Sequence, residues 1–386
     1  MSHRLTSLAV LATVVVAAPL GARDKPTPAI PSVEDAPIAY LLDASSGQVL
    51  FERDIDRRFM PASITKVMTT FLAFEWMEEG RLFPQQVFGI RPETFRQWSR
   101  KGSTMFLPAD ARVTVDDLLH GVTTVSANDG AVVLAEGAAG SVEDWVVAMN
   151  AKAREIGMAD SWFGNPNGWM DKGKTFVTAR DLGTLAQAIV TRHPSKYRHF
   201  VGAREFEYNG ITQSNHDPIS GVVRGADGIK TGFTNQAGFG FLGSAQRDGR
   251  RLVMVVGGSP GARARARASR SLIEWGFETF DSRTLFEPGE RIATARVQGG
   301  GASKVGLTAP RGIRVSVPKD SDPQISLSVR YEGPLRAPIA EGEHVAELLV
   351  TVTGMPGYRV PLVAREEVLE ATTIQRAFNA FRSWLT

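Results

Sequence analysis

Three short motifs, far apart in the sequence, constrain the fold of this chain more than any other feature. Ser63 and Lys66 form a Ser-x-x-Lys pair. Ser126 and Asn128 frame a second motif, and residues 230–232 read Lys-Thr-Gly. In that order they supply a nucleophile, candidate proton carriers and an anion-binding strand, which are the parts of a serine acyl-transferase without a catalytic histidine. The fold has to bring all three into one site.

The first motif is predicted to open a helix. Apolar residues recur at helical intervals after Ser63, and the run ends at Gly80. Because residues three apart are neighbours on a helix, Lys66 can reach the Ser63 hydroxyl. The first turn also offers free backbone N–H groups and the positive end of the helix dipole to a developing negative charge.

A second Ser-x-x-Lys pair, Ser316 with Lys319, has the pattern of a strand. It lies at the end of an alternating stretch, and Pro318 is expected to terminate the strand. Side chains at odd spacings point to opposite faces of a strand, so this serine and lysine should not meet. We therefore assign the nucleophile to Ser63.

An aliphatic hydroxyl is a poor nucleophile at neutral pH, so a base must take the proton of Ser63. Lys66 can do so only if its pKa falls, and burial or the nearby charge of Lys230 would lower it. Ser126 is a candidate proton relay, and Asn128 could hold a substrate amide or fix the lysine. Taken singly, Ser126 reads as a helix-capping serine and the Lys-Thr-Gly run as an exposed turn. The ordered combination favours catalysis.

The three motifs resemble the signature motifs of the penicillin-recognising serine enzymes. From about Pro37 to the C-terminus, the chain resembles one branch, the low-molecular-mass serine D-alanyl-D-alanine carboxypeptidases. The matching stretches are 61–66, 126–129, 165–168, 178–181 and 227–234. The resemblance implies that Ser63 attacks the penultimate D-Ala carbonyl of a peptidoglycan stem peptide, that the terminal D-Ala leaves, and that water hydrolyses the acyl-enzyme. It also implies covalent inhibition by β-lactams.

The resemblance assigns substrate-binding residues as well. The oxyanion hole would be the backbone N–H groups of Ser63 and Phe233. Lys230 and Thr231, followed by Gly232, would face the terminal carboxylate of the substrate. With Asn128, these residues complete the expected substrate-binding set beside the catalytic Ser63, Lys66 and Ser126.

One departure from the family pattern concerns the residue that helps to hold this carboxylate. The family often has an arginine upstream of the Lys-Thr-Gly strand, whereas residues 213–218 here read Gln-Ser-Asn-His-Asp-Pro. His216 and Arg224 are candidates to replace it, and an exposed loop histidine is the alternative interpretation of His216. Neither is placed among the expected catalytic residues.

Two other functions are compatible with parts of the sequence. A β-lactamase would need a second base for deacylation, and the Glu-x-x-Leu-Asn element of the class A enzymes is missing, since residues 143–146 read Glu-Asp-Trp-Val. A non-catalytic peptidoglycan-binding scaffold would have no reason to keep Lys66 and Lys230 beside a serine. We therefore expect a D,D-carboxypeptidase, with endopeptidase action left open.

The predicted fold class is α+β, with a β-lactamase/transpeptidase-like antiparallel sheet flanked by helices and a helical lobe across residues 37–283. The active site would lie in the cleft between lobe and sheet. Short alternating runs broken by glycine and proline predict a small β-rich domain at 284–365, as a spacer or partner-binding module. Expected strands are 38–42, 48–52, 204–208, 228–232, 239–245 and 251–257, and expected helices are 63–80, 115–123, 127–138, 145–156, 179–190 and 262–280.

The two ends of the chain predict its location. Residues 1–22 have the charge, apolar run and small residues of a secretory signal peptide, followed by a linker at 23–36. An uncleaved anchor is the alternative. In the tail, residues 366–386, apolar side chains between Ile374 and Leu385 repeat with a helix period. We expect a periplasmic protein held peripherally on the outer face of the cytoplasmic membrane by an amphipathic helix, the alternative being that the tail packs on the β-rich domain.

Composition limits the possible partners. The chain contains no cysteine, so disulfides and thiolate metal sites are excluded. Its six histidines show no metal-like spacing, and we expect no cofactor. The net charge of +3 over 386 residues gives no indication of nucleic-acid binding.

Overall fold

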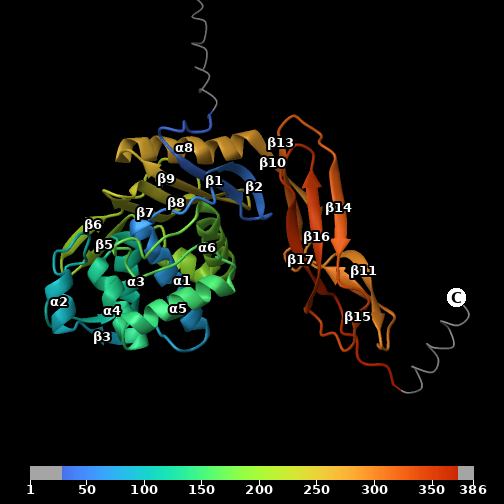
Figure 1. The fold of residues 1–386 in the computed structure, drawn as a ribbon, viewed down its shortest axis with the longest axis horizontal. Coiled ribbons are helices and arrows are strands. Elements are labelled where there is room, and N and C mark those ends of the chain that lie inside the picture. The colour runs from blue at the N-terminus through green and yellow to red at the C-terminus, as the bar shows by residue number, and fades with distance from the viewer. Residues whose placement is uncertain (1–27, 373–386) are drawn as a thin grey trace, which may run out of the picture.

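The computed structural model describes residues 28–372, which form two domains joined after a long helix, α8 (Figure 1). The first domain is built on a five-stranded antiparallel sheet with strand order β2-β1-β9-β8-β7. Its strands are β1 (Ile38–Asp43), β2 (Gln48–Arg53), β7 (Ala226–Thr234), β8 (Gly238–Arg247) and β9 (Arg250–Ser259). The first and last of these segments lie side by side, because β1 pairs with β9. This arrangement confirms the predicted fold class.

The sheet is covered on both faces, and the side chains of β9 show how. Val253 and Val255 pack into the core beneath the helical lobe. Leu252 and Met254 point the other way, into a second core under α8 (Ala262–Thr279). Because alternate side chains of a strand point to opposite faces, a strand buried on both faces reads as a continuous apolar run. The run at the centre of β9 has this pattern.

The helical lobe surrounds α1, which is apolar on nearly every side and lies at its centre. Thr114, Ser141 and Thr178 cap α3, α5 and α6 by accepting a hydrogen bond from the backbone N–H three residues later. The helices are α1 (Lys66–Glu78), α2 (Pro92–Trp98), α3 (Val115–Thr124), α4 (Asn128–Ala139), α5 (Val142–Glu155), α6 (Ala179–Arg192) and α7 (Pro194–Phe200). Two strand pairs complete it: β3 (Val87–Gly89) with β4 (Arg112–Thr114), and β5 (Glu205–Tyr208) with β6 (Ile211–Ser214).

Two helices begin later than the sequence predicts. Ser63 does not lie in the first turn of α1 but in a preceding 3-10 turn, Ala62–Thr65, so that Lys66 is the first residue of the helix. Ser126 does not cap α4, because Ala127 occupies the N-cap position and Ser126 has a left-handed φ of 66°. Both catalytic candidates therefore sit on irregular backbone just ahead of a helix.

The second domain is a six-stranded sheet with a separate apolar core. Counting the pair β10 and β13 beside that sheet, the domain has eight strands among the described residues; the alternating runs at 292–297, 313–317, 325–331, 345–352 and 358–363 predict five of them, and β10, β12 and β15 were not expected. Its order is β14-β16-β17-β12-β11-β15, and β10 pairs with β13 beside it. The bounds are β10 (Phe280–Phe286), β11 (Arg291–Gln298), β12 (Lys304–Thr308), β13 (Ile313–Pro318), β14 (Ile325–Arg330), β15 (Leu335–Arg336), β16 (His344–Val352) and β17 (Tyr358–Ala364).

A buried polar joint connects the two domains. Arg250 Nε donates to Asp43 Oδ2 at 2.8 Å, and Arg250 Nη2 donates to Ser316 Oγ at 2.9 Å. Ser316 Oγ in turn donates to Asp43 Oδ2 at 2.6 Å, and Gln48 bonds both backbone groups of Ser316. The strand ends at Pro318 as predicted, and Ser316, from the second Ser-x-x-Lys pair, is a fully buried structural residue.

The first residues of the tail, 366–372, do not form the expected helix. Residues 366–372 run along the β-rich domain, where Val368 pairs with Ile339 and is 3% exposed. The remaining tail residues, 373–386, and the predicted signal peptide lie outside the described residues. Between residues 28 and 372, no helix combines the length and apolar character needed to cross a bilayer.

Candidate active site

A cleft of about 540 Å³ lies between strand β7, at the edge of the sheet, and the helical lobe. All three sequence motifs contribute to it or lie directly behind it. Its lining includes Ser63, Gly102, Ser103, Ser126, Asn128, Asn167, Gly168, Trp169, Met170, His216, Thr231, Gly232, Phe233, Thr234, Asn235, Phe239, Ala262 and Arg265. The location agrees with the predicted cleft between lobe and sheet.

Lys66 is fully buried at the base of the cleft, with three uncharged partners. Its Nζ lies 3.0 Å from Ser63 Oγ, 2.7 Å from Asn128 Oδ1 and 2.6 Å from the backbone oxygen of Asn167. A neutral amine has two N–H donors, which the two carbonyl oxygens accept, and one lone pair, which remains for the proton of Ser63. The geometry therefore suits a neutral lysine acting as general base.

The electrostatics favour the same protonation state. Burial is the largest cause that lowers the pKa of Lys66 well below its usual value, and the nearby charge of Lys230 lowers it further. Asp129 acts in the opposite direction but more weakly. An ammonium without a carboxylate partner is costly to bury, which favours the neutral amine.

The second motif is positioned by the start of α4. Asn128 Nδ2 donates to the backbone oxygen of Lys101 at 3.0 Å, which turns its Oδ1 toward Lys66. The carboxylate of Asp129 accepts the backbone N–H groups of Met105 and Leu107, at 3.0 and 3.2 Å. These bonds fasten the loop beneath the cleft to the helix, so the orientation of Asn128 is fixed before any substrate binds.

The third motif divides between the two sides of β7. Thr231, Gly232 and Phe233 line the cleft, and the ring of Phe233 is 49% exposed at its rim. Lys230 is not among the lining residues; it is buried on the face of β7 that meets the helical lobe, where its Nζ donates to the backbone oxygen of Thr231 at 3.2 Å. Burial, followed by the charge of Arg265, lowers the pKa of Lys230 to about 7. Lys230 lies next to Lys66, and its expected role toward the substrate carboxylate stays a prediction.

Two glycines allow the nucleophile turn to pack between β7 and the lobe. A Cβ on Gly232 would lie 2.4 Å from the backbone oxygen of Pro61, and one on Gly168 would lie 1.8 Å from that of Ala62. Gly168 also has a left-handed φ of 75°. Any side chain at either position would displace the turn that carries Ser63. Gly232 thus acts on the site through backbone packing.

The sequence reasoning missed two contributors to the cleft. Asn167 supplies the backbone oxygen that binds Lys66, although the stretch 165–168 had been noted for its resemblance. Arg265, on α8, is 9% exposed and lines the cleft, and its Nε has no hydrogen-bond partner among the described residues. Arg263, Arg265 and Arg267 follow one another at spacings of two, which spreads them around a helix and is typical of a solvated surface.

The two candidates for the missing carboxylate-binding arginine have different positions. His216 lines the rim of the cleft and is exposed to solvent. Arg224 pairs with Asp248 at 3.2 Å, and both side chains are mostly exposed. Arg224 is not among the residues that line the cleft. His216 and Arg265 therefore remain as the candidates to bind the substrate carboxylate there.

Comparison with known proteins agrees with this geometry. Residues 25–261 match the D-alanyl-D-alanine carboxypeptidase family S11, and residues 280–370 match the C-terminal domain of penicillin-binding protein 5. D-alanyl-D-alanine carboxypeptidase DacA from Haemophilus influenzae is 30% identical over 378 residues, covering 96% of this chain and 95% of the relative.

Solved structures extend the likeness to the fold. Penicillin-binding protein 5 from Haemophilus influenzae superposes with a TM-score of 0.76 at 29% identity, covering 89% of this chain and 100% of that one. Penicillin-binding protein D2 from Listeria monocytogenes in its ampicillin-bound form gives a TM-score of 0.57 at 27% identity, covering 63% of this chain and 97% of that one. By sequence, fold and the arrangement of its three motifs, the chain belongs to the serine-type D-alanyl-D-alanine carboxypeptidase family S11.

Proposed function

We propose that the protein removes the terminal D-Ala from peptidoglycan stem pentapeptides. The Nζ atom of Lys66 takes the Ser63 proton as Oγ attacks the penultimate D-Ala carbonyl, and the proton passes to the leaving amine of the terminal D-Ala. Water then attacks the ester, with the same base, and frees the enzyme. The close approach of Lys66 Nζ to Ser63 Oγ and two carbonyl oxygens carries this proposal.

The other motif residues take supporting roles in the proposal. The backbone N–H groups of Ser63 and Phe233 form the oxyanion hole. Ser126, 4% exposed and lining the cleft, relays the proton toward the leaving amine. Asn128 holds Lys66 and a substrate amide. The charge of Lys230 lowers the pKa of Lys66.

Arg265 is proposed to bind the terminal carboxylate together with Thr231. A buried guanidinium with an unsatisfied N–H at the wall of a cleft favours an anionic partner, and a carboxylate matches its geometry. Arg265 would add its charge to that of the neighbouring Lys230. Its position near Phe239, at 5.8 Å from the ring centroid, orients it across the strand.

Replacing Arg265 by glutamine should lower kcat/KM for a pentapeptide with a free carboxylate by roughly tenfold to a hundredfold, the cost of one charged hydrogen bond. A pentapeptide with a C-terminal amide should lose little further activity in this variant. Release of D-Ala from the free acid and D-alaninamide from the amide, followed by mass spectrometry, would measure both. Arg224→Gln is the matched control and should behave as wild type. Equal losses on both peptides would refute the carboxylate role.

Covalent inhibition by β-lactams belongs to the same proposal. The β-lactam carbonyl would be attacked by Ser63 in place of the peptide carbonyl, and the acyl-enzyme would persist. The ampicillin-bound relative supports this reading. Slow hydrolysis of the acyl-enzyme would distinguish a carboxypeptidase from a β-lactamase. The lifetime of the acyl-enzyme would be measured from the intact mass of the protein over time.

The exported location and the membrane attachment are also proposed. If residues 374–385 form a helix, their apolar side chains fall within an arc of about 120°. That length is too short to span a bilayer but suits binding at its surface.

Deleting residues 373–386 should release the enzyme from lipid vesicles without loss of activity on a soluble peptide. Phe378→Glu combined with Phe381→Glu should do the same, because charge on the apolar face opposes insertion. Sedimentation with vesicles and D-Ala release would be measured in parallel. A truncated protein that still sediments, or one that unfolds, would show that the tail packs on the β-rich domain.

A further inference from the structure

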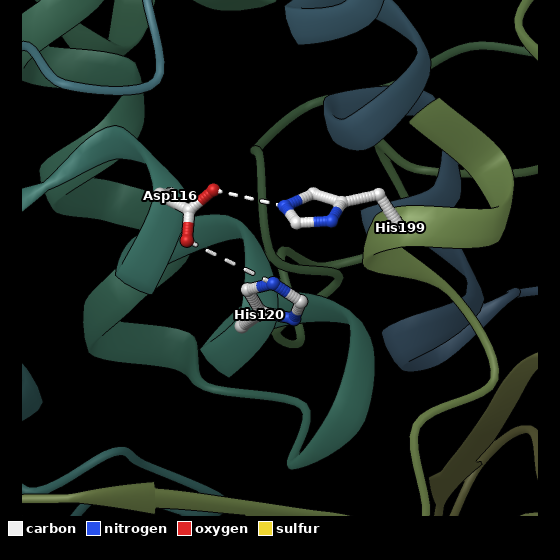
Figure 2. A group of neighbouring side chains, drawn as sticks. All are labelled: Asp116, His120 and His199. Carbon is white, nitrogen blue, oxygen red and sulfur yellow. Dashed lines mark hydrogen bonds and ion pairs between the residues drawn. The ribbon is translucent and has the colours of Figure 1, made fainter. Parts of the chain in front are cut away.

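Two histidines and an aspartate from separate helices meet on the helical lobe (Figure 2). Asp116 and His120 lie one turn apart on α3, and His199 comes from α7. His199 Nε2 is 3.1 Å from Asp116 Oδ1, and His120 Nε2 is 3.8 Å from Asp116 Oδ2. The candidate ligand atoms all lie within 4.8 Å of one another, and none of the three residues lines the cleft.

Packing between the two helices holds this arrangement. Thr123 Oγ1 donates to the backbone oxygen of Phe200 at 2.5 Å, which joins α3 to α7 next to the cluster. The ring of His120 lies 5.0 Å from that of Phe200 and stacks on Phe206 at 6.3 Å. The side chains therefore converge without needing a ligand to draw them together, as a preorganised site requires.

We propose that Asp116, His120 and His199 bind a divalent transition-metal cation, represented by Zn²⁺. Two imidazoles and a carboxylate are a common donor set for such ions. With metal–ligand bonds of about 2.0–2.1 Å, tetrahedral coordination places ligand atoms ~3.3 Å apart. In the structure, His199 Nε2 lies 3.1 Å from Asp116 Oδ1, and His120 Nε2 lies 3.8 Å from the other carboxylate oxygen, Oδ2. Both distances are close to that spacing.

The surroundings suit an open coordination site. The neighbouring carboxylate of Asp117 is engaged in the cap of α3, where it accepts from Thr114 Oγ1 at 2.7 Å, and Asp116 is left to face the histidines. His199 is 59% exposed, so water can complete the coordination. A bound cation would tie α3, which leads to Ser126, to α7.

Titration of the untagged protein with zinc chloride in a calorimeter would test the proposal. We expect saturable binding that is weakened on the order of tenfold or more by His199→Ala and by Asp116→Asn, because each removes a ligand. His344→Ala, which removes an exposed histidine from the β-rich domain, is the matched control and should bind as wild type. Zn²⁺ should also raise the melting temperature of the wild type and of His344→Ala, but not of His199→Ala.

Cobalt and magnesium provide a second readout. Co²⁺ bound by two imidazoles should give visible absorption bands that Zn²⁺ displaces, whereas Mg²⁺ at the same concentration should not compete. Unchanged zinc affinity in both His199→Ala and Asp116→Asn would overturn the proposal, as would the absence of saturable binding in the wild type. Either outcome would leave Asp116, His120 and His199 as a hydrogen-bonded surface cluster only.

Discussion

Replacing Ser63 by alanine should abolish labelling by a fluorescent penicillin and lower D-Ala release by about 10⁴-fold or more. The Oγ atom is the hydroxyl that lies within hydrogen-bond distance of Lys66 Nζ, a buried amine whose pKa is lowered well below its usual value. Without it, no acyl-enzyme forms, and the reaction has only binding and the oxyanion hole left. Ser63 is half-buried in a short turn, so alanine fits without displacing its neighbours.

Ser316→Ala is a matched control, because it removes the serine of the other Ser-x-x-Lys pair. Ser316 is fully buried between the domains and cannot meet a substrate. We expect normal labelling with a lower melting temperature, since the hydroxyl bonds both Asp43 and Arg250. Persistent labelling of Ser63→Ala would contradict the assignment of the nucleophile.

Replacing Lys66 by arginine should lower the acylation rate by about 10² to 10⁴-fold, the usual contribution of a general base. A guanidinium stays protonated at any practical pH, so it has no lone pair for the Ser63 proton. Lys66→Gln keeps two N–H donors but has no basic nitrogen, and should show the same loss. Stopped-flow acylation by a chromogenic β-lactam would be measured, with circular dichroism as the check on folding. Near-normal acylation in either variant would place the base elsewhere, with Ser126 as the next candidate.

The pH dependence of the wild type follows from the same lysine. Below the pKa of Lys66 the ammonium has no lone pair, so acylation should rise as pH rises through that pKa and then level off. The positive charge of Lys230 lowers this pKa, so Lys230→Gln should move the rising limb to higher pH. If the pH dependence of acylation in Lys230→Gln matches that of the wild type, burial alone sets the pKa of Lys66.

The sequence predicted the parts of the site that depend on local spacing. The helix period placed Lys66 within reach of Ser63, and the Lys-Thr-Gly run appeared on a strand at the edge of the cleft. The 3-10 turn at Ala62–Thr65 was missed because its cause is tertiary: Gly168 and Gly232 bring backbone against Pro61 and Ala62. Helical periodicity after Ser63 contains no sign of that contact.

Residues that reach the site from distant elements could not be found in the same way. Arg265 lies within a regular helix, and only the packing of α8 on the sheet directs it into the cleft. The position of Lys230 beside Lys66 depends on which face of β7 meets the lobe. The histidines showed no metal-like spacing because His120 and His199 meet only through the packing of α3 on α7.

The polar joint between the domains restricts the position of the active-site cleft relative to the β-rich domain. Hydrogen bonds and ion pairs have direction, so Asp43, Arg250 and Ser316 fix an angle where an apolar contact would tolerate sliding. In Figure 1 the described chain leaves the β-rich domain at the end opposite its junction with α8. If the attachment proposed for residues 373–386 exists, the joint would keep the cleft at a fixed distance from the membrane, and the length of the β-rich domain would set that distance.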